Sequence, residues 1–229
     1  MLYKTLQWTV APVIRAAWRP DFEGREHIPE EGPAILACNH LSVADHYFLA
    51  LATSRHIATM AKIEYFMRPG LKGKLIGATV RGLGQVAVDR SGGRKSAQAL
   101  GPSEQVLQNG QLFAIFPEGT RSPDGKLHKG RTGVARLALS SGAPVIPIGL
   151  TGTDEVLPFG TTRPRLAKVS VRIGKPLAFT KYANSLAPDR ITLRAVTDEI
   201  MAAIADLSGQ EYVDTYARRR QVNSEPPSE

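Results

Sequence analysis

The stretch that most constrains the fold is residues 35–53, ILACNHLSVADHYFLALAT. It starts within an apolar run, residues 34–38, whose length and composition are typical of a buried strand rather than a helix. The apolar pattern breaks at Asn39-His40 and resumes with helical spacing behind Ser42, which is placed to cap a helix. We therefore expect a strand, a turn and a helix in direct succession.

The turn carries a histidine, His40, and five positions later an aspartate, Asp45. Such a pair can activate an attacking hydroxyl, because the imidazole takes the proton while the carboxylate fixes the tautomer and stabilises the imidazolium. A structural interpretation is also open, in which residues 42–45 form a capping box and His40 is a core histidine. The pair by itself does not decide between catalysis and structure.

Apolar runs and turn residues alternate along the rest of the chain. The runs predict further strands at 22–28, 56–61, 82–90, 112–116, 145–150 and 168–173, and helical spacing predicts helices at 94–109, 132–141 and 189–208. We expect the helix 94–109 to break at Gly101-Pro102. Pro144 and Pro147 place the strand 145–150 at a sheet edge or at a bend. Strands alternating with helices indicate a single α/β domain with a sheet covered on both faces.

The two ends of the chain differ from this pattern. Residues 1–20 have apolar positions on one helical face with Trp8 and Trp18 at its margins, but charged residues and a proline interrupt the run too early for a membrane span. The segment suits an amphipathic helix in a membrane interface and equally one packed on the domain. No secretory signal is expected. We assign residues 21–209 to the domain and 210–229 to a polar tail, disordered from Arg218 onward.

The net charge of +8 is concentrated in one segment, residues 55–95. Its nine Lys or Arg residues stand against only two acids, Glu64 and Asp89. The basic residues are Arg55, Lys62, Arg68, Lys72, Lys74, Arg81, Arg90, Arg94 and Lys95. This density favours an anionic partner such as phosphate groups or a membrane leaflet, although a solvated basic face has the same composition. No nucleic-acid partner is expected, because no binding motif or aromatic platform accompanies the charge.

Cysteine and metal chemistry are limited by the composition. Cys38 is the single cysteine, which excludes an internal disulfide and is typical of a reducing compartment. No cluster of Cys, His and acidic residues has metal-ligand spacing, so no metal is expected.

Four stretches of the chain, taken in order, resemble the motifs of the glycerolipid acyltransferases, the group that contains 1-acyl-glycerol-3-phosphate (lysophosphatidic acid) acyltransferase. They are Asn39-His40-x4-Asp45, GQVAVDR at 84–90, FPEGTRS at 116–122 and VIPIG at 145–149. The resemblance covers roughly residues 23–180 and implies a mixed, mostly parallel sheet of the glycerol-3-phosphate acyltransferase type. The second motif departs from the family pattern, because Ala87 stands where an aromatic residue is usual. This difference affects the shape that the resemblance implies for the acceptor pocket.

The resemblance implies transfer of an acyl chain from an acyl thioester of coenzyme A or acyl carrier protein to the free hydroxyl of a lysophospholipid. Lysophosphatidic acid, giving phosphatidic acid, is the expected acceptor, with glycerol-3-phosphate or another lysophospholipid as the alternative. His40 is then the general base and Asp45 its orienting partner. No cofactor and no acyl-enzyme are required, in agreement with the lack of a Gly-x-Ser-x-Gly elbow. A non-catalytic membrane scaffold and a basic nucleic-acid-binding module are the alternatives from other classes.

The third motif supplies the expected contacts to the acceptor. Gly119, Thr120 and Arg121 offer backbone donors and a guanidinium at a strand end, which suit a phosphate, and Glu118 can hydrogen-bond a glycerol hydroxyl. A plain turn with a surface arginine is the structural alternative. Further phosphate candidates are Lys62 and Arg90, each at the end of an expected strand. Together with residues 1–20, the basic segment predicts peripheral attachment to the anionic, cytoplasmic face of the cell membrane.

Overall fold

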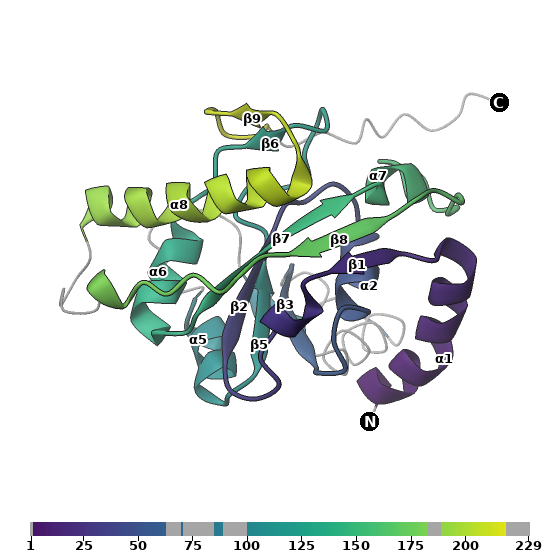
Figure 1. The fold of residues 1–229 in the computed structure, drawn as a ribbon, viewed down its shortest axis with the longest axis horizontal. Helices are drawn as coiled ribbons and strands as arrows, with labels where there is room; N and C mark the ends of the chain where they lie inside the picture. Colours follow the sequence, from purple (N-terminus) through teal and green to yellow (C-terminus); the bar gives the residue numbers. More distant parts are fainter. Residues whose placement is uncertain (1, 63–69, 71–84, 89–99, 183–188, 219–229) are drawn as a thin grey trace.

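The computed structural model describes residues 2–62, 70, 85–88, 100–182 and 189–218 (Figure 1). A seven-stranded sheet has the order β1-β8-β7-β2-β5-β3-β4. Its strands are β1 (Asp21–Glu23), β2 (Ala34–Cys38), β3 (Ile57–Lys62), β4 (Gln85–Val88), β5 (Leu112–Ile115), β7 (Val145–Thr151) and β8 (Ser170–Ile173). Neighbouring strands are parallel except for β7 and β8, which are antiparallel. The mixed, mostly parallel sheet is therefore confirmed.

Helices cover both faces of this sheet (Figure 1). On one side lie α1 (Leu2–Trp18) and α2 (Asp45–Ala50), and on the other lie α5 (Gly101–Gln108), α6 (Gly133–Ser141) and α8 (Arg190–Ser208). The short helix α7 (Thr153–Val156) follows β7, and single 3-10 turns occupy Arg25–His27 and Thr180–Tyr182. A separate parallel pair joins β6 (Leu127–His128) to β9 (Tyr212–Val213).

Strand β2 shows why an uninterrupted apolar run suits this fold. All five of its residues are buried. Leu36 and Cys38 belong to the core that includes Phe48 of α2, whereas Ile35 belongs to the core that includes Ile200 of α8. Because successive side chains of a strand point to opposite faces, a strand covered on both faces needs apolar residues at every position.

The position of β7 excludes a sheet edge, one of the two alternatives that its prolines predict, the other being a bend. It lies inside the sheet between β8 and β2, and six of its seven residues are buried. The backbone nitrogens of Val145 and Pro147 face the same neighbour because they are two residues apart. The Val145 N–H donates to the carbonyl of Leu177, but opposite Pro147 the paired strand has already ended at Ile173. Gly174, the next residue, still donates its N–H to the carbonyl of Pro147 at 2.8 Å, so the only bond missing from this pair is the one that proline cannot donate.

Two boundaries also differ from their predictions. The expected break at Gly101-Pro102 is instead the start of α5, where a proline near the first position loses no hydrogen bond. Residues 94–99 of the predicted helix lie outside the described residues. The strand predicted at 22–28 ends at Glu23, because Gly24 takes a left-handed conformation with φ of 75°.

The ends of the chain carry a helix and a strand. α1 confirms the expected N-terminal helix, and the described residues contain no helix long and apolar enough to cross a membrane. Residues 210–217, expected to begin a polar tail, instead include β9 and pack on the segment around β6. Residues 219–229 lie outside the described part of the chain.

Candidate active site

The candidate site lies where several parallel strands end. His40 follows β2 by two residues, Glu118 follows β5 by three, and Thr153 follows β7 by two. Because β5, β2 and β7 are neighbours and run in the same direction, their carboxyl ends meet at one edge of the sheet. Ligand sites of open α/β sheets form at this edge.

His40 and Asp45 form the pair that the sequence predicts. The Nδ1 of His40 lies 2.7 Å from Oδ2 of Asp45, whose side chain is fully buried, while 15% of the His40 side chain is exposed. A carboxylate only accepts hydrogen bonds, so Nδ1 carries the proton of the neutral ring and Nε2 keeps its lone pair. The imidazole also stacks on Phe116, with 4.0 Å between ring centroids. The ring is therefore held in the tautomer and plane that a general base requires.

Half of the capping box that the structural interpretation predicts also forms. The Oδ2 of Asp45 accepts the backbone N–H groups of Leu41 at 2.8 Å and Ser42 at 3.0 Å. Ser42, expected to cap the helix, lies two residues before the N-cap Ala44 and accepts the N–H of Ala44 on its hydroxyl. The same carboxylate thus orders the turn and orients the histidine.

Two further hydrogen-bonded contacts join this turn to β7 and to the residues that follow it. The hydroxyl of Thr153 donates to Oδ1 of Asp45, the oxygen that His40 does not use. The side-chain amide of Asn39 exchanges two hydrogen bonds with the backbone of Leu150, at 2.8 and 2.7 Å. Sequence reasoning missed Thr153, which is 108 positions from Asp45 and carries no pattern of its own.

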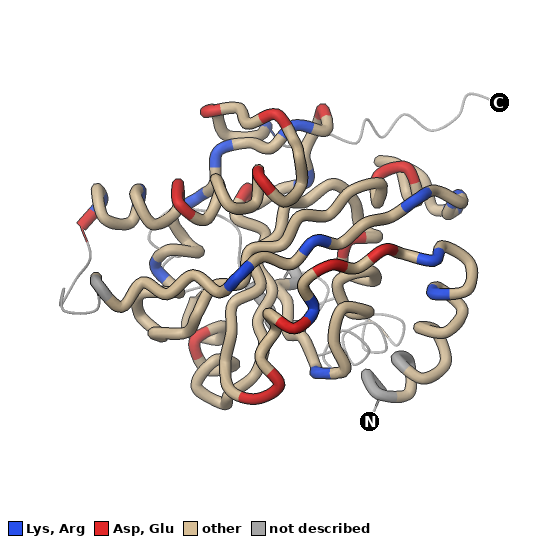
Figure 2. The backbone as a smooth tube through the Cα atoms, in the orientation of Figure 1, with Lys and Arg blue, Asp and Glu red and all other residues tan. Residues whose placement is uncertain are grey.

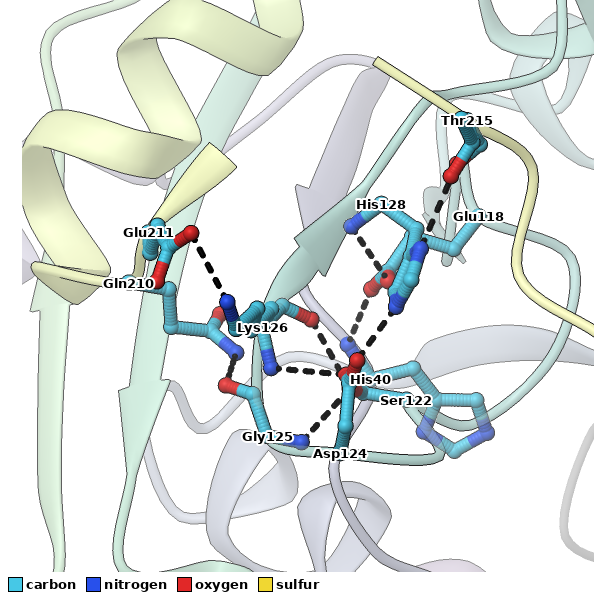
Figure 3. Close-up of polar contacts among 10 residues, drawn as sticks. All are labelled: His40, Glu118, Ser122, Asp124, Gly125, Lys126, His128, Gln210, Glu211 and Thr215. Carbon is cyan, nitrogen blue, oxygen red and sulfur yellow. Dashed lines mark hydrogen bonds and ion pairs between the residues drawn. The ribbon is translucent and has the colours of Figure 1, made fainter. Parts of the chain in front are cut away.

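Glu118 links two backbone segments at the sheet edge. Its Oε1 accepts the N–H of His40 at 3.1 Å and its Oε2 accepts the N–H of His128 at 3.0 Å (Figure 3). The side chain is buried, with 1% exposed, and burial raises its pKa to about 7 although the two N–H groups favour the charged form. Glu118 thus joins the His40 turn to β6, and its contact with a glycerol hydroxyl stays a prediction.

The turn at residues 119–121 is tied to His40 at both of its ends. Glu118 binds the N–H of His40, and the N–H of Ser122 donates to the carbonyl of His40 at 2.7 Å. Gly119 has a φ of 76°, a conformation that favours glycine. The guanidinium carbon of Arg121 lies 4.4 Å from the ring centroid of Phe159. The residues on either side of Gly119, Thr120 and Arg121 are thus hydrogen-bonded to the backbone of His40, one through a side chain and one through its own backbone.

Residues 210–217, here called the C-terminal strap, cover the segment 122–131 (Figures 1 and 3). Ion pairs join Glu211 to Lys126 and Asp214 to Lys129, both at 2.8 Å. In Figure 2, acidic and basic stretches of the backbone lie near each other around β6 and β9. Further contacts join Gln210 to Asn39 and to the carbonyl of Gly125, and the ring of His128 to Asp124 and to the carbonyl of Thr215. Sequence reasoning missed the strap because its composition is that of a polar tail.

Of the other two predicted phosphate ligands, Lys62 and Arg90, the structure describes only the backbone of Lys62. Lys62 ends β3 at the same sheet edge, but its side chain is outside the described residues, as is the whole of Arg90. Most of the basic segment lies outside them too. Arg55, at its start, donates to the carbonyls of Pro29, Gly32 and Gly110. Among the described residues, no group of three or more His, Cys, Asp and Glu can hold a metal ion.

Comparison with known proteins gives a consistent result. Residues 19–151 match the family described as Acyltransferase. A 1-acyl-sn-glycerol-3-phosphate acyltransferase of Limnanthes alba is 32% identical over 158 residues, covering 69% of this chain and 54% of that protein. The chloroplastic one of Arabidopsis thaliana is 32% identical over 145 residues, covering 63% of this chain and 39% of its own length. Thus this chain matches only about half of these relatives.

A solved structure supports the same relationship across most of the chain. The crystal structure of the 1-acyl-sn-glycerophosphate acyltransferase of Thermotoga maritima matches with a TM-score of 0.64 and 27% identity, covering 89% of this chain and 82% of that one. The residues matched by the family, 19–151, include His40, Asp45 and the third motif. The chain therefore belongs to the Acyltransferase family.

Proposed function

We propose that this protein transfers an acyl chain from a thioester of coenzyme A or acyl carrier protein to the free hydroxyl of a lysophospholipid. The proposed acceptor is lysophosphatidic acid, and the product is phosphatidic acid. The pairing of His40 with the buried Asp45 at the sheet edge is the observation that carries the proposal. The names of the matching relatives, acyltransferases for 1-acyl-sn-glycerol-3-phosphate, support the choice of acceptor.

In the proposed reaction, Nε2 of His40 removes the proton of the acceptor hydroxyl while its oxygen attacks the thioester carbonyl. The tetrahedral intermediate then loses the thiolate as the C–S bond breaks, and the imidazolium returns the proton to the sulfur. Asp45 stabilises the imidazolium between the two steps. No acyl-enzyme is needed. Cys38 is an unsuitable nucleophile, because its thiol is buried in β2 and burial raises its pKa well above the usual value.

The phosphate of the acceptor is proposed to bind the turn formed by Gly119, Thr120 and Arg121. A guanidinium with adjacent backbone N–H groups suits a phosphate oxygen, and the ties to His40 hold this turn at a constant position relative to the base. Lys62 and Arg90 remain proposed as additional ligands on the grounds of the sequence. Such a site binds the headgroup while it presents the hydroxyl to His40.

Release of free thiol from an acyl thioester tests the proposal directly. The wild type should release thiol with lysophosphatidic acid, and the panel should include glycerol-3-phosphate and a zwitterionic lysophospholipid. His40→Ala should reduce turnover by about 10² to 10⁴-fold, the contribution of a general base. His27→Ala is a matched control outside the site, where the ring contacts the carbonyl of Ile173, and should leave turnover nearly unchanged.

Two outcomes would contradict this function. If the wild type releases no thiol with any acceptor of the panel, the protein is not the proposed acyltransferase. A His40→Ala variant that is folded by circular dichroism and keeps a third or more of the turnover would show that His40 is not the base.

We further propose that the protein attaches peripherally to an anionic membrane surface, on the cytoplasmic face. α1 packs on the domain through Ala11 but exposes Trp8 (83%) and Val13 (63%) to solvent. Exposed tryptophan and valine on an amphipathic helix suit the membrane interface. The basic segment, known here from its sequence, supplies the electrostatic part of the attraction.

A further inference from the structure

We propose that Arg131 is a second binding residue for the acceptor phosphate, acting beside Arg121 and selecting acceptors that carry a phosphate monoester. The proposal rests on the proposed function and adds a residue to its acceptor site. Arg131 lies three residues after β6 and two before α6, outside the four motifs.

The side chain of Arg131 lies directly over the turn of the third motif. A β-carbon placed on Gly119 would lie 2.9 Å from Nε and 3.0 Å from Cδ of Arg131, closer than such atoms approach. The backbone of Arg131 is held in register by its N–H, which donates to the carbonyl of Pro117 at 2.8 Å. The absence of a side chain at Gly119 thus gives the arginine its place on the turn.

The rest of the site orients the guanidinium of Arg131. Its central carbon lies 5.2 Å from the ring centroid of Tyr216, a residue of the C-terminal strap, within the range of a cation–π contact. The turn at 119–121, against which the Arg131 side chain lies, is tied to His40 through Glu118 and Ser122. A charge on this turn therefore lies close to the place where the acceptor hydroxyl must react.

Charge pairing distinguishes the two arginines from the other cations nearby. Lys126 and Lys129 are each neutralised by an acid of the strap, at 2.8 Å. Neither Arg121 nor Arg131 has a carboxylate partner within the described part of the chain, and each contacts an aromatic ring instead. A cation held against a ring keeps its charge available, so each of the two guanidinium groups can still bind an anion.

Two guanidinium groups match a phosphate monoester better than a diester. A monoester carries about 1.5 to 2 negative charges near neutral pH and has three terminal oxygens, enough for two forked contacts. A diester headgroup carries one negative charge and has two terminal oxygens. Arg131 should therefore favour lysophosphatidic acid or glycerol-3-phosphate over lysophospholipids with a substituted phosphate.

Arg131→Met tests this role, because methionine keeps an unbranched stem to pack on Gly119 and Tyr216 but removes the charge. The KM for lysophosphatidic acid should rise about 10-fold, the loss of one charged hydrogen-bonding group. The KM for the acyl donor should stay unchanged, and so should kcat/KM for monoacylglycerol, which has no phosphate. Arg172→Met is the matched control, since Arg172 is exposed on β8 and paired with Glu23.

Binding without turnover separates this proposal from the proposed function. Phosphorus NMR titration of glycerol-3-phosphate should show binding to the wild type and to Arg172→Met, and at least 10-fold weaker binding to Arg131→Met. If this pattern appears but the wild type transfers no acyl chain, the acyltransferase function fails while the anion site stands.

Three results would overturn the role of Arg131. The first is an unchanged KM for lysophosphatidic acid in Arg131→Met, together with unchanged binding of glycerol-3-phosphate. The second is an equal loss with lysophosphatidic acid and monoacylglycerol, which would make Arg131 a structural support of the turn. The third is a wild type that binds no glycerol-3-phosphate at all.

Discussion

Replacing Glu118 by glutamine should make the stability of the protein less dependent on pH. Burial raises the pKa of Glu118 from 4.5 to about 7, and the N–H groups of His40 and His128 offset this only in part. An acid whose pKa is higher in the folded than in the unfolded protein binds more protons when folded. Its contribution to stability is therefore complete below pH 4.5 and is lost as the pH rises through about 7.

The size of the effect follows from these two pKa values. Between the two pKa values, each pH unit changes the free energy of unfolding by about 1.36 kcal/mol. The wild type should therefore lose about 2–3 kcal/mol of stability between pH 5 and pH 8 through this group. Glutamine does not titrate in this range. At pH 5 the variant should be the less stable protein, because its NH₂ group faces one of the two backbone N–H donors and leaves it unpaired, at a cost of about 1–3 kcal/mol. This disadvantage should disappear toward pH 8.

The assay is urea unfolding followed by circular dichroism at pH 5, 6, 7 and 8, at constant ionic strength. Groups elsewhere titrate alike in both proteins and cancel in the difference between their unfolding free energies. Glu211→Gln, which removes an exposed carboxylate, is the matched control. A difference between wild type and Glu118→Gln that is constant with pH, or that moves in favour of the wild type toward pH 8, would refute the reasoning.

Other consequences of the structure can be measured alongside. Asp45→Asn should keep the fold, because asparagine can still accept the N–H groups of Leu41 and Ser42, but it should lower kcat by about 10²-fold or more. A variant that loses stability but keeps its activity per folded molecule would favour a purely structural Asp45. Thr153→Val should lower kcat and leave the acceptor KM unchanged. Thr153→Ser should restore kcat, because serine keeps a hydroxyl that can donate to the Asp45 carboxylate. Equal kcat in the two variants would contradict a positioning role. The protein should sediment with anionic but not zwitterionic vesicles, less so at high salt, and Trp8→Ala should weaken this binding; equal binding to both vesicles would contradict the electrostatic part.

Features that depend on neighbouring residues could be predicted from the sequence. The strand, turn and helix that hold His40 and Asp45 form one local unit, so a spacing of five residues was enough to predict their contact, which is observed at 2.7 Å. The helix α8 was likewise predicted from its apolar period, and the structure adds its two caps, Asp189, whose carboxylate accepts the N–H of Thr192, and Gly209 in the left-handed conformation. In both cases the chain itself fixes the distance between the residues concerned.

Features that depend on which strands are neighbours were decided by the tertiary structure. β2 lies between β5 and β7, and this order brings Glu118 and Thr153 to the His40 turn from positions 78 and 108 residues away from their partners. The same packing places Arg131 on Gly119 and holds residues 210–217 over the site. Apolar periodicity reports which face of an element is buried, but it contains no information about the residue that lies opposite. The strand order, and with it the partners of each polar side chain at the sheet edge, depends on how the two cores pack against the sheet.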